Sequence, residues 1–374
     1  MLRWSSMDDL DRIQACLSNR LDQGAIGKRR TAGVIGTAPS QYSKSPALWN
    51  GAFRHLGMDA IYVPMDVEVR RVQELLAALR RSERMLGVNV TVPHKLAVMP
   101  YLDSIDALAK RIGAVNTIVR SPDGRLSGHN TDSGGFINSI LEAQPGSRAS
   151  FVPALENRTV LLLGAGGSAR AVAFGVAERL GHGRLIVCNR TLSHAQELAA
   201  EIRKLDRDAQ AIDEAGLRQW APQADVIINS TTKGQGGFQR LGNGIVQTTE
   251  PYSSLACAAV IAVPELEYSK TDSADPSMQR FAAEVAANQR ASLELAQQIP
   301  AEARFYDLIY HPEETIFLRH GRLTGHATMN GKTMIIGQAV LAFCDHICKT
   351  QLVELAKSDS ASRAQITQWM NECW

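Results

Sequence analysis

An apolar run that leads directly into a glycine-rich turn is the feature that most restricts the fold of this chain. The run 161–163 is followed by Gly164, Ala165, Gly166, Gly167, Ser168 and Ala169, an arrangement of the type GxGxx(G/A). The glycines allow a tight turn and let bare backbone approach a pyrophosphate, while the next helix supplies N–H groups from its N-terminus. A strand pattern precedes this turn, and a helix and a second strand follow it at the required distances. The sequence therefore predicts a dinucleotide-binding sheet.

The end of that second strand indicates which dinucleotide is bound. An NAD site usually has an acidic residue here, whereas this chain has Asn189, Arg190 and Thr191. An arginine at this place can pair with the 2′-phosphate of NADP, although it could also be a solvated surface side chain. His194 is a largely neutral imidazole and would hold phosphate less firmly. We therefore expect NADP as the cofactor and leave use of NAD open.

The order of segments along the chain predicts an α/β protein with two domains. A chain of 374 residues exceeds what one hydrophobic core usually serves. Strand and helix patterns alternate from residue 32, break in a stretch rich in Pro, Gly and Ser at 143–157, and resume at Thr159. We expect an N-terminal helical extension (1–31), an α/β substrate domain (32–136 with 331–374) and a Rossmann domain (137–330) with an insertion near 238–303. Within the insertion, 251–276 has the pattern of a surface loop with a short strand near Val260.

The N-terminal extension has the pattern of a capped amphipathic helix. Ser6 precedes Asp8 and Asp9, and the apolar positions that follow are Leu10, Ile13, Leu17 and Leu21. The segment lacks the apolar core of a signal peptide and the length of a bilayer span. We expect a cytoplasmic protein.

Composition excludes several classes of partner. Lys and Arg total 40 against 38 for Asp and Glu, a balance that argues against bulk attraction to nucleic acid or to a membrane. The six cysteines lack the dense spacing of a disulfide scaffold. Cys344 and Cys348 lie four apart, but no nearby Cys or His pair completes a zinc set, so we expect structural cysteines and no metal.

Short motifs in both halves of the chain are similar to those of the shikimate dehydrogenase family, including its quinate/shikimate members. The resemblance covers most of 32–136, 157–236 and 305–343. The motifs are Ser-Lys-Ser-Pro (43–46), Asn-Val-Thr-Val-Pro-His-Lys (89–95), Gly-Ala-Val-Asn-Thr (113–117), Gly-His-Asn-Thr-Asp (128–132) and Asn-Ser-Thr-Thr-Lys-Gly (229–234). Several independent matches in the right order rarely arise by chance.

The resemblance implies roles for individual residues. It implies a catalytic pair, Lys95 and Asp132. It implies substrate contacts at Ser43, Ser45, Asn89, Thr91, Asn116, Tyr310 and Gln338. It implies cofactor contacts at Ser230, Thr231, Thr232, Gly331 and Met334, in addition to the glycine-rich turn and to Asn189, Arg190, Thr191 and His194.

The chemistry of these residue types supports the assignment. Oxidation of a secondary alcohol needs a group that takes the hydroxyl proton as hydride leaves, and Lys95 can do this beside the carboxylate of Asp132. Taken alone, Lys95 would be a solvated lysine and Asp132 a turn-forming aspartate. Ser43 and Ser45 alternate, so on an extended segment both hydroxyls could reach one carboxylate, whereas taken alone they would be helix caps.

The resemblance implies an NADP-dependent oxidoreductase that interconverts shikimate and 3-dehydroshikimate on the chorismate pathway to the aromatic amino acids. Ser133 and Thr333 stand where glycines are common in the family, which leaves the ring acid open. The alternatives are a dehydrogenase for quinate or another shikimate-like acid with relaxed use of NAD and NADP, and a non-catalytic sensor that binds NADP and a ring acid. A homodimer is also left open.

Overall fold

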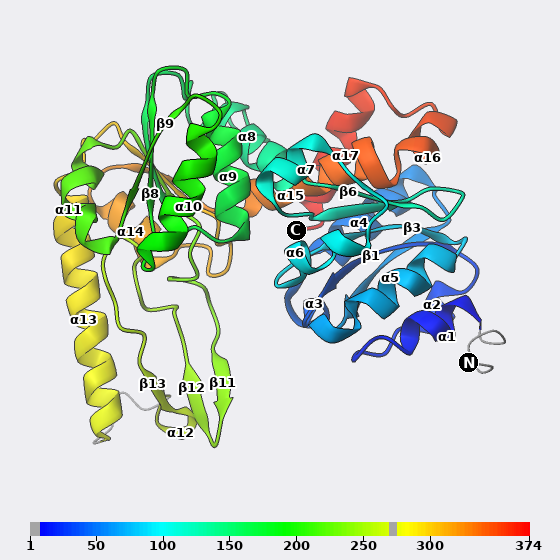
Figure 1. Cartoon of the computed structure of the whole chain (residues 1–374), viewed down its shortest axis with the longest axis horizontal. Coiled ribbons are helices and arrows are strands. Elements are labelled where there is room, and N and C mark those ends of the chain that lie inside the picture. The colour runs from blue at the N-terminus through cyan, green and yellow to red at the C-terminus, as the bar shows by residue number, and fades with distance from the viewer. Residues whose placement is uncertain (1–7, 269–274) are drawn as a thin grey trace. The chain divides into compact units, whose positions relative to one another are not determined.

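The computed structural model describes residues 8–268 and 275–374. The chain divides into two compact units, Met1–Asn138 with Ile335–Trp374, and Ser139–Met334. Each unit is built on a six-stranded sheet with helices packed against it (Figure 1). The predicted α/β class is therefore confirmed.

The first unit contains a mixed sheet with the strand order β2-β1-β3-β5-β6-β4. Its pairs β1–β2, β1–β3 and β4–β6 are parallel, and β3–β5 and β5–β6 are antiparallel. The strands are β1 (Arg30–Gly36), β2 (Ala60–Asp66), β3 (Met85–Val90), β4 (Ser104–Ile105), β5 (Thr117–Arg120) and β6 (Leu126–His129). Both faces of β1 are buried, because Val34 belongs to one hydrophobic cluster and Ile35 to another. Its apolar run is typical of a strand that is covered on both sides.

The longer helices α4 and α5 of the first unit bury apolar residues in the two hydrophobic clusters on either side of this sheet. Leu75 and Leu76 of α5 belong to one cluster, and Leu48 and Trp49 of α4 belong to the other. The helices are α1 (Asp9–Gln14), α2 (Gln23–Ile26), α3 (Pro39–Tyr42), α4 (Ser45–Leu56), α5 (Val72–Arg81), α6 (His94–Ala97), α7 (Ala107–Ile112), α8 (Asp132–Leu141), α15 (Lys332–Leu341), α16 (Lys349–Glu354) and α17 (Ser360–Glu372). Short 3₁₀ turns cover Val69–Arg71 and Met99–Tyr101, and a π-helix covers Ala342–Ile347.

The N-terminal segment is less helical than its pattern predicts. Helix α1 ends at Gln14, and its cap is Asp8, whose side chain accepts a hydrogen bond from the N–H of Asp9. The predicted cap Ser6 lies outside the described residues. Leu21 lies beyond the helix but is still buried in the same core as Leu10 and Ile13. The prediction of one helix through Leu21 is wrong because residues 18–19 bond to strand β2 instead of continuing the helix.

Asn19 fastens this segment to the edge strand β2, which gives a stability prediction. Its Nδ2 donates to the carbonyl of Pro64 at 3.0 Å, and its Oδ1 accepts from the N–H of Asp66 at 2.7 Å. Asn19→Ala leaves both backbone groups without this partner, so we expect the free energy of unfolding to fall by about 1–3 kcal/mol in urea titrations. Gln23→Ala, an exposed position in the same segment, should change it by less than about 0.5 kcal/mol. Equal effects of the two substitutions would contradict the anchoring role.

The second unit contains a parallel sheet with the order β15-β14-β10-β7-β8-β9. Counted along the chain, this is the order 3-2-1-4-5-6 of a Rossmann fold, with the change of direction between β7 and β10. The strands are β7 (Thr159–Leu163), β8 (Arg184–Cys188), β9 (Asp208–Ile212), β10 (Val226–Asn229), β14 (Arg304–Asp307) and β15 (Ala327–Met329). Residues 160–163 of β7 and 226–228 of β10 are apolar and buried, which is typical of a parallel sheet that is covered on both faces. The predicted Rossmann sheet is confirmed.

The helices of the second unit range from four to 21 residues in length. They are α9 (Gly167–Ala177), α10 (Leu192–Arg203), α11 (Leu217–Trp220), α12 (Glu265–Tyr268), α13 (Pro276–Ala296) and α14 (Ile316–Leu323), with 3₁₀ turns at Glu214–Gly216 and Ala221–Gln223. Figure 1 shows α9 and α10 on one face of the parallel sheet. Trp220, Leu295 and Phe317 from α11, α13 and α14 share a core with strand residues.

The insertion between β10 and β14 forms a small antiparallel sheet with its own core. Its strands are β11 (Gln239–Gly242), β12 (Ile245–Gln247) and β13 (Ala262–Pro264). The sheet extends away from the parallel sheet with α13 beside it (Figure 1). Val246 and Val263 of the sheet pack with Met278 and Phe281 of α13.

One sequence prediction about the insertion is wrong. The stretch that was expected to be a surface loop begins with buried residues, since Tyr252 is 0% and Leu255 1% exposed. Asn288 of α13 holds the backbone of this stretch against the helix. Its amide accepts from the N–H of Ser253 at 2.8 Å and donates to the carbonyl of Ala256 at 3.1 Å. Residues 269–274 of the predicted loop lie outside the described residues.

Candidate functional site

Lys95 and Asp132 form a close ion pair in the first unit. Lys95 lies in α6, and Asp132 is the first residue of α8. Lys95 Nζ donates to Asp132 Oδ2 at 2.6 Å, with the two side chains 12% and 2% exposed. Asp132 also lies at the N-terminus of a ten-residue helix, where the backbone dipole favours a carboxylate. The structure thus brings together the two residues that the sequence singled out for proton transfer.

Asn116 holds the other side of this carboxylate. Its Nδ2 lies within hydrogen-bond distance of Asp132 Oδ1 at 2.9 Å and of Gln338 Oε1 at 3.0 Å. Its Oδ1 accepts from the N–H of Thr131 at 2.8 Å. Asn116 is 2% exposed, so these bonds fix its orientation. Both oxygens of Asp132 are therefore occupied, one by Lys95 and one by Asn116.

A chain of hydrogen bonds extends from Asn116 to the predicted substrate residue Asn89. The Thr117 hydroxyl is 3.0 Å from Asn116 Oδ1, and Asn89 Nδ2 donates to Thr117 Oγ1 at 3.1 Å. The Tyr62 hydroxyl donates to Asn89 Oδ1 at 2.8 Å. Tyr62 was not predicted from the sequence, since it stands in an apolar strand pattern. Thr117 ends the motif 113–117 but was given no role of its own.

The buried Tyr62 connects this network to Ser45. Burial raises the pKa of the Tyr62 phenol well above its usual value, and a hydrogen bond with Ser45 acts against that rise. The phenol therefore stays protonated and can keep donating to Asn89. Predicted residues from five separate segments, Ser45, Asn89, Asn116, Asp132 and Gln338, are thus joined with Lys95 in one polar network.

Ser43 and Ser45 lie at a junction of two helices, and the expected extended segment is wrong. Ser43 follows α3 with extended backbone, but Ser45 is already the first residue of α4. The Ser43 hydroxyl accepts from the N–H of Ser45 at 3.3 Å, which is a helix-capping contact. Both side chains remain half-buried. Thr91 follows β3, is half-buried, and shares a hydrogen bond with Tyr42.

Two buried residues position the helices that carry the ion pair. His94 Nε2 lies 2.7 Å from the carbonyl of Val67, and burial lowers the pKa of the imidazole, which keeps His94 neutral next to Lys95. Asn130 Oδ1 accepts from the N–H of Asp132 at 3.1 Å and so caps α8. Asn130 Nδ2 also donates to the carbonyl of Ala114.

A pocket of about 570 Å³ lies at the carboxyl ends of β7, β8 and β10 in the second unit. In a Rossmann sheet this is the edge at which dinucleotides bind. Ten predicted cofactor residues line the pocket: Gly164, Ala165, Gly166, Asn189, Arg190, Thr191, His194, Ser230, Thr231 and Thr232. The pocket is therefore built from the loops that the sequence indicated.

The glycine-rich turn at the end of β7 has the geometry of a phosphate cradle. Gly164 has a φ of +106°, and a Cβ there would lie 2.6 Å from the Ser230 hydroxyl, so only glycine fits. Around Gly166, in contrast, an added Cβ would meet no atom within 4 Å. Helix α9 begins after Gly166 without a side-chain cap, which leaves its first N–H groups for an anion. These residues fit a dinucleotide pyrophosphate.

The residues expected at the adenosine ribose lie on the same edge of the sheet. Arg190, Thr191 and His194 are exposed at the pocket after β8. Asn189 Nδ2 donates to the carbonyl of Thr191 at 2.8 Å and so stiffens the turn that carries Arg190. Nothing acidic occupies positions 189–191, which fits a 2′-phosphate.

Some predicted cofactor residues do not line this pocket. Gly167, Ser168 and Ala169 begin helix α9, and Ala169 is fully buried. Gly331 and Met334 belong to the chain that follows β15, and a Cβ on Gly331 would lie 2.0 Å from the carbonyl oxygen of Leu308. Tyr310, which was predicted as a substrate contact, also lies outside this pocket; it follows β14 and is half-buried.

The pocket also has lining residues that sequence reasoning missed. Glu214 follows β9, and four residues come from the insertion: Gln247, Thr249, Ser254 and Val260. None of the motifs found in the sequence lies in the insertion, so no motif indicated this role.

Asp307 is a buried carboxyl at the end of β14. Its Oδ1 accepts from Asn229 Nδ2 at 3.0 Å and from the N–H of Ile309 at 2.9 Å, and its Oδ2 accepts from the Thr315 hydroxyl at 2.7 Å. Burial outweighs these bonds and raises the pKa of Asp307 from 3.8 to about 7. Its role is structural, because it ties β10, β14 and α14 together.

The raised pKa of Asp307 predicts a pH-dependent stability. Because the folded state holds this proton more tightly than the unfolded chain, the contribution to stability is full below pH 3.8 and is lost as the pH rises through about 7. Asp307→Asn keeps a neutral group of the same shape. In urea titrations, we expect the variant to lose less stability than the parent chain between about pH 5 and about pH 8. An identical loss in both chains would contradict the assignment.

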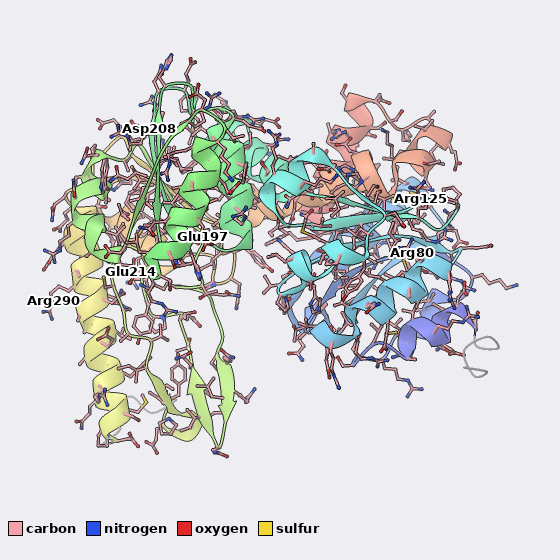
Figure 2. The ribbon with its side chains drawn as sticks, in the orientation of Figure 1. Arg80, Arg125, Glu197, Asp208, Glu214 and Arg290 are labelled. Carbon is pink, nitrogen blue, oxygen red and sulfur yellow. The ribbon has the colours of Figure 1, made fainter. Side chains whose placement is uncertain are left out.

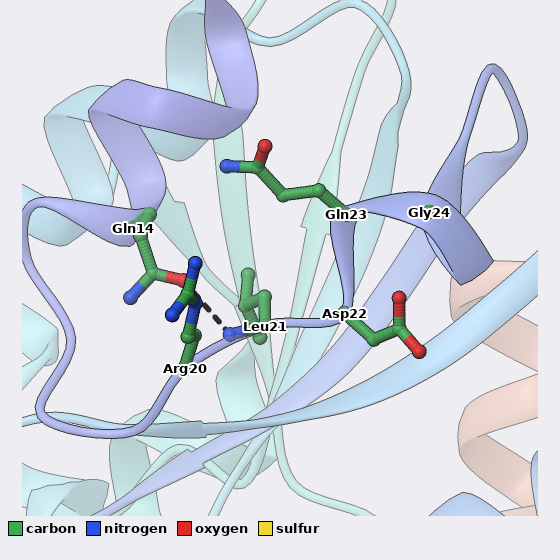
Figure 3. A pocket seen from close by; sticks show the side chains of 6 residues that line it. All are labelled: Gln14, Arg20, Leu21, Asp22, Gln23 and Gly24. Atoms are coloured by element: carbon green, nitrogen blue, oxygen red, sulfur yellow. Dashed lines mark hydrogen bonds between the residues drawn. The ribbon is translucent and has the colours of Figure 1, made fainter.

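The first unit also has a hollow, which is shaped by the turn between α1 and α2. It lies beside α1 and α2 and is lined by Gln14, Arg20, Leu21, Asp22, Gln23 and Gly24 (Figure 3). The N–H of Leu21 donates to Gln14 Oε1 at 2.8 Å, and Gln14 Nε2 donates to the carbonyl of Asn19 at the same distance. These bonds shape the turn, and no predicted site residue lines this hollow.

Neither a metal cluster nor a membrane-spanning helix occurs in the described part of the chain. Across residues 8–268 and 275–374, no three His, Cys, Asp or Glu side chains are grouped to hold a metal ion. None of the helices described there has the length and apolar character that a bilayer span requires.

Comparison with known proteins links both units to one family. The family described as shikimate dehydrogenase substrate binding domain matches residues 34–118, and that described as shikimate / quinate 5-dehydrogenase matches residues 148–265. A shikimate dehydrogenase (NADP(+)) from Desulforamulus reducens is 33% identical over 85% of this chain and 89% of its own length. Another, from Caldanaerobacter subterraneus subsp. tengcongensis, is 32% identical over 83% and 89%.

A solved structure supports the same relationship. The shikimate 5-dehydrogenase from Thermus thermophilus, in complex with NADP(H) and shikimate, has a TM-score of 0.61 and 25% identity. The match covers 92% of this chain and 99% of that one. The sequence matches span both the ion pair of the first unit and the glycine-rich turn of the second. The chain belongs to the shikimate dehydrogenase family.

Proposed function

We propose that this chain is an NADP-dependent oxidoreductase that interconverts shikimate and 3-dehydroshikimate. Its relatives are named shikimate dehydrogenase (NADP(+)), and a structural relative was solved with NADP(H) and shikimate. The observation that carries the proposal is the 2.6 Å contact between Lys95 and Asp132 inside a buried polar network. Transfer of the alcohol proton needs such a pair, whereas binding of the two ligands alone does not.

Lys95 is the proton-transfer residue in this proposal. In oxidation, neutral Lys95 takes the hydroxyl proton while the carbinol C–H bond breaks, and in reduction the Lys95 ammonium returns that proton to the forming alkoxide. NADP, when bound, accepts the hydride. Asp132 stabilises the ammonium through Oδ2 and is held through Oδ1 by Asn116. Asn116 acts through Asp132 as a positioning residue, and its expected contact with the ring acid stays a prediction.

The ring acid is held by polar groups of the same network in this proposal. Ser43 and Ser45 supply hydroxyl donors for the carboxylate, while Asn89, Thr91 and Gln338 face the ring hydroxyls. The protonated Tyr62 supports Asn89 from behind through a 2.8 Å bond. Tyr310 is assigned to the substrate on the resemblance alone.

The cofactor is held by the pocket of the second unit in this proposal. The turn at Gly164 and Gly166 takes the pyrophosphate, and Arg190 with His194 takes the 2′-phosphate. Met334 and Gly331 are assigned to the nicotinamide end on the resemblance alone. We also propose a cytoplasmic enzyme, which agrees with six cysteines that form no disulfide. A homodimer remains a prediction.

Two other functions are distinguishable from this one. The first is a dehydrogenase for quinate, which differs from shikimate in the substituents of the same ring. Ser133 and Thr333 stand close to the expected ligands, at positions where glycines are common in the family. A non-catalytic sensor would bind NADP and a ring acid without hydride transfer.

The test is a matrix of two substrates and two cofactors. Formation of reduced nicotinamide is followed by absorbance with shikimate or quinate and with NADP or NAD. We expect the highest kcat/KM with shikimate and NADP. Turnover with quinate but not with shikimate would identify quinate as the substrate. Saturable binding of both ligands without turnover in any combination would favour the sensor.

A further inference from the structure

The insertion contributes a wall of the dinucleotide pocket. Gln247 ends β12, and Thr249, Ser254 and Val260 follow it before β13. Ser254 is 3% exposed, and among the described residues its hydroxyl has no hydrogen-bond partner. A buried hydroxyl without a partner costs free energy unless another group meets it. This wall therefore has the character of a ligand-contacting surface.

Glu214 is held rigidly beside the same pocket. Its Oε1 accepts from Lys233 Nζ at 2.5 Å, and Lys233 Nζ also donates to the carbonyl of Ala256 at 2.8 Å. The side chains of Lys233 and Glu214 are 9% and 17% exposed. Because Lys233 balances its charge, Glu214 can face the pocket without repelling a nucleotide. The Cys257 thiol, a weak donor, also bonds to Glu214.

The order of strands indicates which end of the dinucleotide Glu214 would meet. The sheet runs β10-β7-β8-β9, with the glycine-rich turn after β7, Arg190 after β8 and Glu214 after β9. If Arg190 takes the 2′-phosphate of the adenosine ribose, the base attached to that ribose lies toward the loops after β8 and β9. In Figure 2, Glu214 lies near the end of the parallel sheet from which the inserted strands extend.

We propose that Glu214, fixed by Lys233, accepts a hydrogen bond from the exocyclic amino group of adenine, and that the inserted segment 247–260 covers the base. The site then selects adenine dinucleotides over those whose base carries an oxo group at the same position. This inference rests on the proposed NADP-dependent function. An ion pair that served only to anchor the carbonyl of Ala256 would not need to border the pocket.

The test compares NADP with nicotinamide hypoxanthine dinucleotide phosphate by isothermal titration calorimetry. The analogue replaces the amino group, a donor, by an oxygen that faces the Glu214 carboxylate. We expect the parent chain to bind it about ten- to a hundredfold more weakly than NADP, because a hydrogen bond to a charged group is lost. In Glu214→Gln the amide can turn a donor toward that oxygen, so the difference should shrink to within about threefold.

Matched variants separate the possible failures. Glu197→Gln, an exposed glutamate on α10 also labelled in Figure 2, should keep the discrimination of the parent chain. Ser254→Ala should weaken the binding of both dinucleotides several-fold. Unchanged affinity in this variant would show that the inserted segment does not contact the dinucleotide. Equal binding of NADP and its analogue by the parent chain overturns the inference while the proposed function stands. Failure to bind NADP at all overturns both.

Discussion

Lys95→Ala is expected to lower kcat for shikimate oxidation by about 10²- to 10⁴-fold, the usual contribution of a positioned acid or base. The variant lacks the group that takes the hydroxyl proton as hydride leaves. Its dinucleotide affinity should stay unchanged, because the pocket of the second unit contains no part of Lys95. Steady-state turnover and calorimetric binding of NADP measure the two effects separately.

The control for this prediction is Lys110→Ala. Lys110 is an exposed lysine in α7 of the same unit and should keep the turnover of the parent chain. Removal of Lys95 also leaves Asp132 buried without its ion-pair partner, so the stability of the variant is measured in urea beside its activity. A folded Lys95→Ala chain with kcat within about threefold of the parent would contradict the proton-transfer role.

Gly166→Ala is expected to weaken NADP binding about ten- to a hundredfold while the fold stays intact. Its backbone is in an extended conformation that alanine adopts freely, and the added Cβ would meet no protein atom within 4 Å. The methyl group would instead occupy the space in which the pyrophosphate approaches the backbone, with a cost of about 1–3 kcal/mol for overpacking. Calorimetry with NADP and urea titration measure the two properties.

Two other glycines give the comparison for Gly166. Gly164→Ala should destabilise the chain itself, because its φ is +106° and the Ser230 hydroxyl leaves no room. Gly24→Ala, where the nearest neighbour of an added Cβ is Asp22 Oδ1 at 3.4 Å, should change neither property. Unchanged NADP affinity in Gly166→Ala would contradict the placement of the pyrophosphate.

The Rossmann sheet could be predicted because its signals are local. The strand 159–163, the glycine-rich turn and the start of α9 are contiguous, and each reflects backbone geometry that few other residues allow. Arg190 was predicted for the same reason, since it follows the end of the next strand. The ion pair of Lys95 and Asp132 could be proposed from motifs, but its 2.6 Å geometry depends on contacts 37 residues apart along the chain.

Other parts of the site depend on tertiary contacts that no local pattern encodes. Tyr62 is part of an ordinary apolar strand pattern, and only its neighbours Asn89 and Ser45 turn it into a support for the network. Likewise, burial of Tyr252 depends on the packing of α13, whose Asn288 bonds to the backbone beside it. The pocket wall formed by the insertion was not predicted because none of the short motifs found in the sequence lies in residues 247–260.

The most direct test of the proposed function follows the hydride itself. Shikimate that carries deuterium at the carbinol carbon is incubated with the purified chain and NADP, and the reduced cofactor is examined by mass spectrometry. Our proposal predicts deuterium in the reduced dinucleotide together with 3-dehydroshikimate. Saturable binding of both ligands with no deuterium transferred would contradict it and would support the sensor.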